Sequence, residues 1–247
     1  MSALDTQPMS WSRFIERCEL LWRFQVTLRI LRRVNLRGVV LEVSSFPRHI
    51  KNFFWTGNYE RIECDFAEKH LSSDDQILEV GGAVGFIGLF CQKILGVGRY
   101  AVVEPNPATA ELLRRNYLLN RLEPNLFQVA LAAQDGTVDL EVGGIFWGNS
   151  MVQANSGSNS TVRVTAMTLQ SLIRQLRFVP NTLIMDVEGA ETLILFRSLP
   201  GEIRKILIEL HPAVTGVEKA LKVIGELRAE GFKVLEEENS VYFLSRV

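Results

Sequence analysis

Carboxylates gather in the stretch Asp186-Val-Glu-Gly-Ala-Glu191, directly behind the apolar run 181–185. A bare acid beside a buried strand is costly unless it meets a partner or a ligand, so we expect Asp186 to be functional. Glu209 and His211 stand at the end of a second apolar run. Polar groups at the strand ends of an open α/β sheet face the ligand crevice. The predicted catalytic residues are therefore Asp186, Glu188, Glu209 and His211.

These side chains could do two kinds of chemistry. Asp186, Glu188 or His211 could remove a proton from a substrate as a general base. Alternatively, Asp186, Glu209 and His211 could hold a divalent cation, because oxygen-rich clusters suit Mg, Ca or Mn. Glu191 falls in the first turn of the helix expected to follow, where the helix dipole stabilises a carboxylate without any catalytic role.

A glycine-rich turn, Glu79-Val-Gly-Gly-Ala-Val-Gly85, lies between an expected strand and an expected helix. Gly81 and Gly85 allow the backbone to approach a ligand closely, and the helix start offers free amides. The spacing does not match the dehydrogenase fingerprint G-x-G-x-x-G, which counts against an NAD-dependent oxidoreductase. Glu104 ends the next strand, 19 residues after Gly85. A carboxylate there can accept hydrogen bonds from both ribose hydroxyls of an adenosine ligand.

Strands and helices alternate beyond residue 72, which predicts parallel crossover units in a doubly wound α/β sheet. The last two strand-like runs, 232–235 and 241–244, are joined by only five residues. Because a parallel crossover needs a dozen or more residues, these runs must form an antiparallel hairpin. This arrangement favours the class I methyltransferase fold over a dinucleotide-binding dehydrogenase. The other expected strands are 37–43, 76–80, 100–103, 126–130, 137–142, 161–165, 181–185 and 205–210, and the expected helices are 11–34, 59–71, 84–95, 109–120, 169–176, a helix from Ala190, and 217–230.

The first 58 residues are expected to form an extension with an amphipathic helix and a strand. Residues 1–51 carry nine Lys and Arg against four Asp and Glu, whereas the whole chain has a net charge of −1. We expect the helix to cover a flank of the core, to form a homodimer contact, or to lie on an anionic membrane surface. The loop 148–160, rich in Gly, Ser and Asn, is expected to be a lid or rim of the cleft, or a mobile hairpin.

The composition bears on nucleic-acid binding, membrane spanning and cellular compartment. The near-neutral net charge gives no global footprint for nucleic acid. Arg23 and Arg29 interrupt the most apolar early segment, so no transmembrane segment is expected. Three cysteines without metal-ligand spacing indicate a reducing compartment, and we expect a cytoplasmic protein.

A set of motifs, from about residue 55 to the C-terminus, resembles in order and spacing the FkbM family of S-adenosylmethionine (AdoMet)-dependent methyltransferases. These motifs are Tyr59-Glu60, the glycine loop, Glu104-Pro-Asn-Pro107 with Asn116 and Asn120, Ala130-Leu-Ala-Ala-Gln-Asp-Gly136, Thr168-Leu169, Asp186-Val-Glu-Gly-Ala-Glu191 and Glu209-Leu-His211. The chain departs from the family's usual pattern, which has Asp at 79, Asn at 83, Asp at 170 and Lys at 185.

The resemblance implies a methyltransferase domain over residues 59–247 with AdoMet as the cofactor. It implies a small-molecule or glycan acceptor, methylated on a hydroxyl of a sugar, of a lipid-linked saccharide or of another natural product. The alternative function is an AdoMet-binding scaffold without turnover. The cofactor-binding residues that we expect are Glu79, Gly81, Gly82, Ala83, Gly85, Glu104, Pro105, Asn106 and Ala130.

Overall fold

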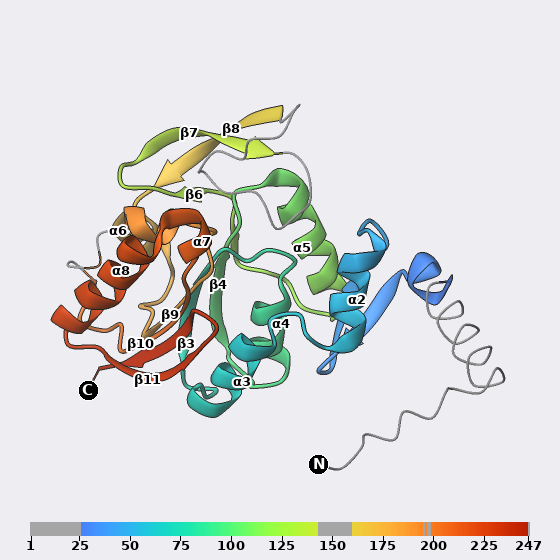
Figure 1. Ribbon diagram of the computed structural model, residues 1–247, viewed down its shortest axis with the longest axis horizontal. Helices are drawn as coiled ribbons and strands as arrows, with labels where there is room; N and C mark the ends of the chain where they lie inside the picture. The colour runs from blue at the N-terminus through green and yellow to red at the C-terminus, as the bar shows by residue number, and fades with distance from the viewer. Residues whose placement is uncertain (1–25, 143–159, 195, 197–198, 247) are drawn as a thin grey trace, which may run out of the picture.

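A seven-stranded sheet forms the centre of the protein (Figure 1). The computed structural model describes residues 26–142, 160–194, 196 and 199–246. All neighbouring strands are parallel except β12, which runs antiparallel to both of its neighbours. The predicted doubly wound sheet with an antiparallel C-terminal hairpin is therefore confirmed. In spatial order the strands are β5 (Leu126–Phe127), β4 (Arg99–Val103), β3 (Gln76–Val80), β9 (Thr182–Met185), β10 (Lys205–Glu209), β12 (Val241–Ser245) and β11 (Lys233–Glu238).

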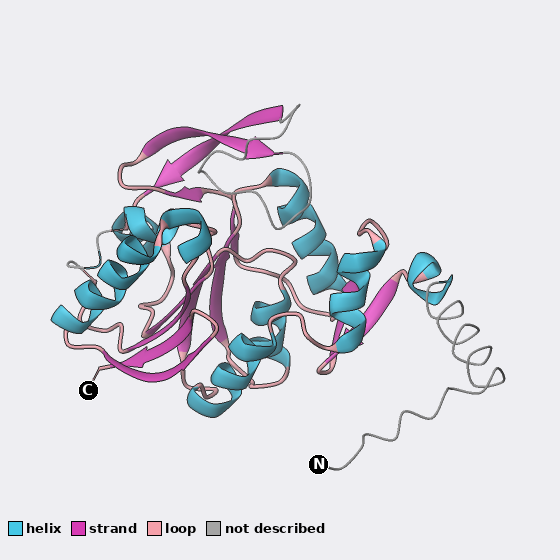
Figure 2. Ribbon diagram, in the orientation of Figure 1, coloured by secondary structure: helices cyan, strands magenta, loops and turns pink. Residues whose placement is uncertain are grey.

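Helices cover both faces of this sheet (Figures 1 and 2). One face carries α3 (Arg61–His70), α4 (Phe86–Lys93) and α5 (Pro107–Leu119), and the other carries α6 (Leu169–Gln175) and α8 (Val217–Ala229). Two buried apolar clusters correspond to the two faces. Strands buried on both sides must be apolar throughout, which explains why the central strands read as continuous apolar runs.

A separate three-stranded sheet lies beyond β5. Its strands are β6 (Ala130–Leu131), β8 (Ser160–Met167) and β7 (Gly136–Val142), with β7 antiparallel to β8. The single strand predicted over 126–130 is therefore wrong, because its two ends pair in different sheets. Most of the predicted lid loop, residues 148–159, lies outside the described residues.

The N-terminal extension contains a hairpin of β1 (Arg33–Leu36) and β2 (Val39–Glu42), followed by α2 (Arg48–Thr56). The continuous strand predicted over 37–43 is wrong, because Arg37 and Gly38 turn the chain with φ of 47° and 86°. The helix predicted over 11–34 ends too late, since Val34 is already in β1. Residues 1–25 lie outside the described part, so most of that helix remains a prediction.

Two other short elements differ from the sequence expectations. The segment from Ala190 begins as a 3₁₀ turn, η2 (Ala190–Leu193), where a helix was expected. A one-turn helix, α7 (Pro212–Thr215), follows His211 and was not predicted. Both elements lie next to the residues of the acidic motif, so they affect how its side chains are held.

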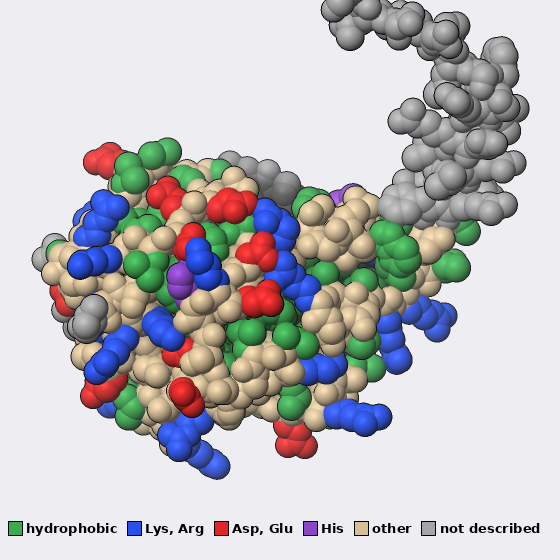
Figure 3. All heavy atoms as spheres, turned by 90° about the horizontal axis from the view of Figure 1, so that it is seen from below, with side chains coloured by type: hydrophobic (Ala, Val, Ile, Leu, Met, Phe, Trp, Pro, Cys, Tyr) green, Lys and Arg blue, Asp and Glu red, His purple; other side chains and the backbone are tan. Residues whose placement is uncertain are grey.

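Three further features concern the described helices, the charged surface and the cysteines. None of the described helices has the length and apolar character needed to cross a bilayer. On the face seen in Figure 3, Lys and Arg side chains alternate with Asp and Glu side chains. Cys64 and Cys91 are both buried and free.

Two asparagines of α5 hold the N-terminal hairpin against the main domain. Asn116 is fully buried, accepts a hydrogen bond from the Glu42 amide at 2.8 Å and donates one to the Val84 carbonyl at 2.9 Å. Asn120 accepts from the Val40 amide at 3.0 Å and donates to the Val40 carbonyl at 2.7 Å. Backbone groups of the hairpin thus form hydrogen bonds with side chains at the C-terminal end of α5, so the extension is part of the folded core.

Replacing Asn116 by Ala should lower the free energy of unfolding by about 1–3 kcal/mol, because it leaves two buried backbone groups unpaired. Urea denaturation followed by circular dichroism measures this change. Leu118→Ala, on the exposed side of the same helix, is the matched control and should change stability by less than about 0.5 kcal/mol. Equal stability of the two variants would contradict the docking role of Asn116.

Candidate active site

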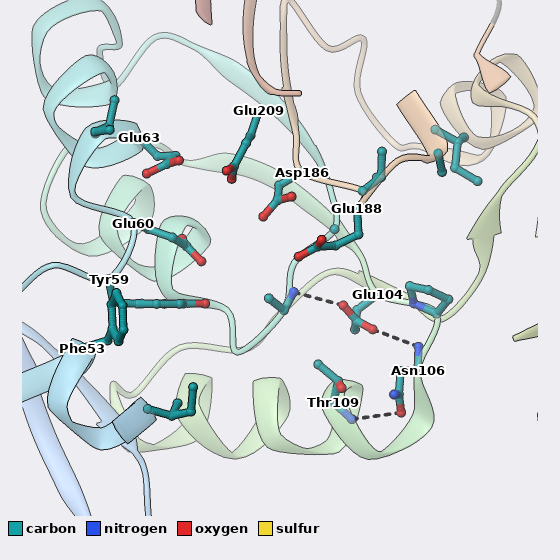
Figure 4. A pocket seen from close by; sticks show the side chains of 18 of the residues that line it. Phe53, Tyr59, Glu60, Glu63, Glu104, Asn106, Thr109, Asp186, Glu188 and Glu209 are labelled. Carbon is teal, nitrogen blue, oxygen red and sulfur yellow. Dashed lines mark hydrogen bonds between the residues drawn. The ribbon is translucent and has the colours of Figure 1, made fainter. Parts of the chain in front are cut away.

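A cavity of about 560 Å³ opens at the carboxyl ends of β3, β4, β9 and β10 (Figure 4). Side chains from α2 and α3 close one side of it, and the small sheet at β6 and β7 closes another. The volume lies within the roughly 300–1,000 Å³ that small-molecule sites occupy. The location agrees with the general rule that ligands of open α/β sheets bind beyond the carboxyl ends of the strands.

The turn after β3 forms the floor of the cavity, and its geometry depends on Gly81. This glycine has φ of +92°, and a Cβ atom there would lie 1.6 Å from the carbonyl oxygen of Asp186. Its amide donates to the Val103 carbonyl at 3.0 Å. No other residue type fits this position, because both the backbone conformation and the space require glycine.

Gly82 and Gly85 allow the same turn to pack closely against its neighbours, because a side chain at either position would clash. A Cβ on Gly82 would lie 2.2 Å from Cγ2 of Val102, and one on Gly85 would lie 2.9 Å from Cε2 of Tyr117. Neither residue lines the cavity; they allow α4 to pack closely against β4 and α5. Glycines in such a turn can thus shape a binding loop without contacting the ligand.

Glu104 lies at the end of β4 and faces the cavity (Figure 4). Its Oε1 accepts from the Asn106 amide at 2.9 Å, and its Oε2 accepts from the Ala83 amide at 3.0 Å. Burial raises the pKa of Glu104 to about 7, although these two amides favour the charged form. Each carboxylate oxygen keeps a second lone pair, so two ribose hydroxyls could still donate to it.

The other predicted cofactor residues lie beside Glu104. Pro105 and Ala130 both line the cavity. Asn106 also lines it, but its Oδ1 caps α5 by accepting from the Ala108 and Thr109 amides. Ala83 lines the cavity with φ of +47°, a conformation that Asn adopts more easily than Ala.

Three of the four predicted catalytic residues line the cavity together. Asp186 follows β9, Glu188 is two residues later, and Glu209 ends β10. Oδ1 of Asp186 is buried and accepts no hydrogen bond. Burial is the main cause that raises the pKa of Asp186 above its ordinary value; Glu191 adds to the rise, and His211 opposes it. Burial, together with the charge of Asp186, raises the pKa of Glu188 to about 7.

His211, the fourth, lies behind these acids. Its Nε2 is 3.5 Å from Oδ1 of Asp186 and 3.5 Å from Oε2 of Glu188. It is 4.0 Å from Oε1 of Glu209. Burial alone would lower the pKa of His211, but Glu191 and the other acids outweigh it and raise the pKa to about 9. The imidazole is therefore a cation at neutral pH and cannot serve as a base there.

Glu191 is fully buried and holds His211 in place. Its Oε1 accepts from the His211 amide at 3.0 Å, and its Oε2 accepts from the Gly189 amide at 2.8 Å. Burial opposes ionisation of Glu191, yet hydrogen bonds with His211 lower its pKa below the ordinary value. The expected structural role is thus visible, although the carboxylate joins two loops and does not stabilise a long helix.

Asp186, Glu188 and His211 each offer a ligand atom, and these atoms all lie within 4.8 Å of one another. The trio could therefore hold a divalent cation. Glu209, expected as a ligand together with Asp186 and His211, is further from the imidazole than Glu188 is. A metal-binding role and a proton-transfer role would thus fall on the same side chains.

Glu79 belongs to an inner extension of the site. It is 3% exposed and lines a small second cavity beneath Asp186 and Glu209. Burial raises the pKa of Glu79 to about 8.

Several lining residues were not predicted as site residues. Ile50 and Phe53 come from α2, Tyr59 and Glu60 come from the turn before α3, and Glu63 comes from its first turn (Figure 4). Tyr59 and Glu60 appear in the sequence analysis only as a motif. Helical spacing could not have paired Glu60 with Glu63, because Glu60 is the N-cap residue with φ of 45°.

The strand order, the single antiparallel strand, and a ribose-positioned acid beside a glycine turn together define a class I methyltransferase. The family model described as the methyltransferase FkbM domain matches residues 79–234. The chain belongs to this family of AdoMet-dependent methyltransferases.

Solved structures with a similar fold were also found. A methyltransferase FkbM from Methylobacillus flagellatus KT is 12% identical, with a TM-score of 0.46, and the match covers 93% of this chain and 59% of that one. A ribosomal protein L11 methylase from Lactobacillus delbrueckii subsp. bulgaricus is 9% identical, with a TM-score of 0.46, over 77% of this chain and 79% of that one. A comparison with curated proteins found no match.

The residues present fit AdoMet. The Gly81 backbone offers a surface without a side chain, and Glu104 offers two oxygens to the ribose. The acids beyond them suit a cofactor that carries a positive sulfonium and ammonium. AdoMet supplies an electrophilic methyl group when it is bound.

AdoMet should raise the melting temperature of the wild type, by roughly 5–10 °C at about a hundredfold excess over Kd. Glu104→Ala should abolish this shift, because it removes the ribose acceptors. Differential scanning fluorimetry, with each variant compared with its own ligand-free form, measures the effect. The exposed Glu123→Ala serves as a control that keeps the shift. A shift with NAD and none with AdoMet would contradict the cofactor assignment.

Proposed function

We propose that the protein transfers the methyl group of AdoMet to a hydroxyl of a sugar, a lipid-linked saccharide or another polyhydroxylated natural product. The observation that carries this proposal is the buried Oδ1 of Asp186, which accepts no hydrogen bond from a described residue, in a cavity shared with the predicted cofactor residues. A neutral hydroxyl is a poor nucleophile unless a base removes its proton. Asp186 is suitably placed for this task, and its raised pKa makes it a stronger base than an ordinary Asp.

In the proposed reaction the acceptor oxygen forms a bond to the methyl carbon as the bond from carbon to sulfur breaks. The sulfur keeps the electron pair, which gives S-adenosylhomocysteine (SAH). The hydroxyl proton moves to Asp186. The His211 cation, 3.5 Å from Oδ1 of Asp186, opposes the rise that burial causes in the pKa of this carboxylate.

The proposal is tested by methyl transfer from tritiated AdoMet to a panel of sugars, glycosides and glycolipids. Asp186→Asn should lower kcat by about 10²–10⁴-fold, the usual contribution of a general base, while the Kd for AdoMet stays within a few-fold. In the wild type, kcat/KM should rise with pH, because a base of raised pKa is protonated and inactive below that pKa. Glu123→Gln should leave both unchanged. AdoMet binding without transfer to any acceptor would instead favour the scaffold.

A metal-dependent reaction is the second candidate, and it is favoured by the closeness of Asp186, Glu188 and His211. We expect activity to survive dialysis against EDTA, because the His211 cation already compensates the charge that a metal would neutralise. Activity assays before and after chelation, followed by addition of Mg²⁺ or Mn²⁺, check this. Loss on chelation with recovery on adding either ion would show that the trio holds a metal.

A further inference from the structure

The cavity is rich in acidic side chains. Six carboxylates line it: those of Glu60, Glu63, Glu104, Asp186, Glu188 and Glu209. Among the described lining residues Arg61 carries the only Lys or Arg side chain. That guanidinium is bonded to Asp65 at 2.9 Å and to Glu238 at 2.6 Å. Its charge is therefore already compensated by acids that do not line the cavity.

A second observation concerns the inner extension, which has a volume of about 20 Å³. Five carboxylates line it: those of Glu60, Glu63, Glu79, Asp186 and Glu209. Glu79 is 3% exposed, and a hydrogen bond with Tyr100 opposes the rise that burial causes in its pKa. Five carboxylates around so small a space are costly to ionise together, so this extension is ready to receive a donor or a cation.

The environment of these acids determines how a ligand's charge would change their ionisation. Burial is the first cause that raises the pKa of Glu209 to about 8, and Asp186 and Glu63 add to it. Burial likewise raises the pKa of Glu63 to about 7. A bound cation would favour the ionised forms, whereas a bound anion would have to keep several of them protonated. Two cations oppose this pattern: Arg61 lowers the pKa of Glu63, and His211 faces Asp186, Glu188 and Glu191.

We propose that the acidic part of the cavity selects the acceptor by charge. It takes acceptors that are uncharged or carry a protonated amine, such as neutral sugars and amino sugars, and turns away acceptors with a phosphate or carboxylate near the reacting hydroxyl. Like-charge repulsion disfavours anionic acceptors, in addition to any favourable contact that the cavity makes with neutral or amine-bearing acceptors. This inference rests on the proposed function and names its substrate class.

The charge preference can be measured without knowing the acceptor. SAH has an uncharged thioether, whereas sinefungin carries a protonated amine where AdoMet carries its sulfonium methyl. By isothermal titration calorimetry, sinefungin should bind the wild type at least about tenfold more tightly than SAH, since one partly screened charge contact is worth that much. In Glu188→Gln and Glu209→Gln the ratio should fall toward one, and in Glu123→Gln it should stay at the wild-type value.

Equal affinity for the two ligands, or a ratio unchanged in both site variants, would overturn the charge selection while leaving the methyltransferase assignment intact. Failure of AdoMet, SAH and sinefungin all to bind would overturn the proposed function as well. These outcomes are distinct, because SAH binding alone reports the cofactor half of the cavity.

An acceptor assay gives a second readout. Neutral sugars, amino sugars, uronic acids and sugar phosphates are each incubated with tritiated AdoMet, and each methylated product is separated chromatographically from the remaining AdoMet before counting. Labelling of uronic acids and sugar phosphates should be at least about tenfold lower than labelling of neutral sugars and amino sugars. Equal or greater labelling of uronic acids or sugar phosphates would contradict the proposal.

Discussion

The contact between the Gly81 backbone and the Asp186 carbonyl fixes the distance between the two halves of the site. The amide of Asp186 also donates to the Val80 carbonyl at 3.0 Å, which extends the pairing of β3 with β9 to the ends of both strands. Under the proposed function, the glycine turn lies on the cofactor side and Asp186 on the acceptor side. Because neighbouring backbones hold them, their separation does not depend on flexible side chains, and methyl transfer needs such fixed alignment.

A second constraint is electrostatic. Many acids close together would ordinarily remain protonated or repel one another. Glu191 resolves part of this conflict, since it is ionised, fully buried, and bonded to the amides of Gly189 and His211. It keeps His211 charged, and His211 in turn faces Asp186 and Glu188. Glu191, which does not line the cavity, thus influences the pKa of Asp186 and Glu188 through His211, although burial is the larger cause.

The sequence predicted the central fold well because strands buried on both faces leave a strong apolar signal. β3 begins and ends as predicted, and β9 and β10 differ by one residue at most at either end. The strand expected over 126–130 failed because an apolar run does not say which sheet each residue joins. The turn at Arg37 and Gly38 was missed because apolar residues follow it directly and hide the reversal.

The site was predictable only where residues stand at strand ends. Asp186, Glu104 and Glu209 were found in this way, because the topology places strand ends at one edge of the sheet. Glu63 and Phe53 could not be found by that argument, since they come from helices whose docking is set by tertiary contacts. The sequence could not tell that Asp186 lines the cavity whereas Glu191 joins two loops. That difference depends on which carboxylate accepts hydrogen bonds from buried amides.

The wall of the cavity formed by α2 and the start of α3 lies upstream of residues 79–234, the part matched by the family model. The wall formed by α2 and α3 and the glycine turn therefore come from different parts of the chain. Exchanging residues 48–63 between members of the family would replace this wall of the cavity. The glycine turn and Glu104 would stay unchanged. The shape of the cavity on that side can therefore change while the glycine turn and Glu104 do not.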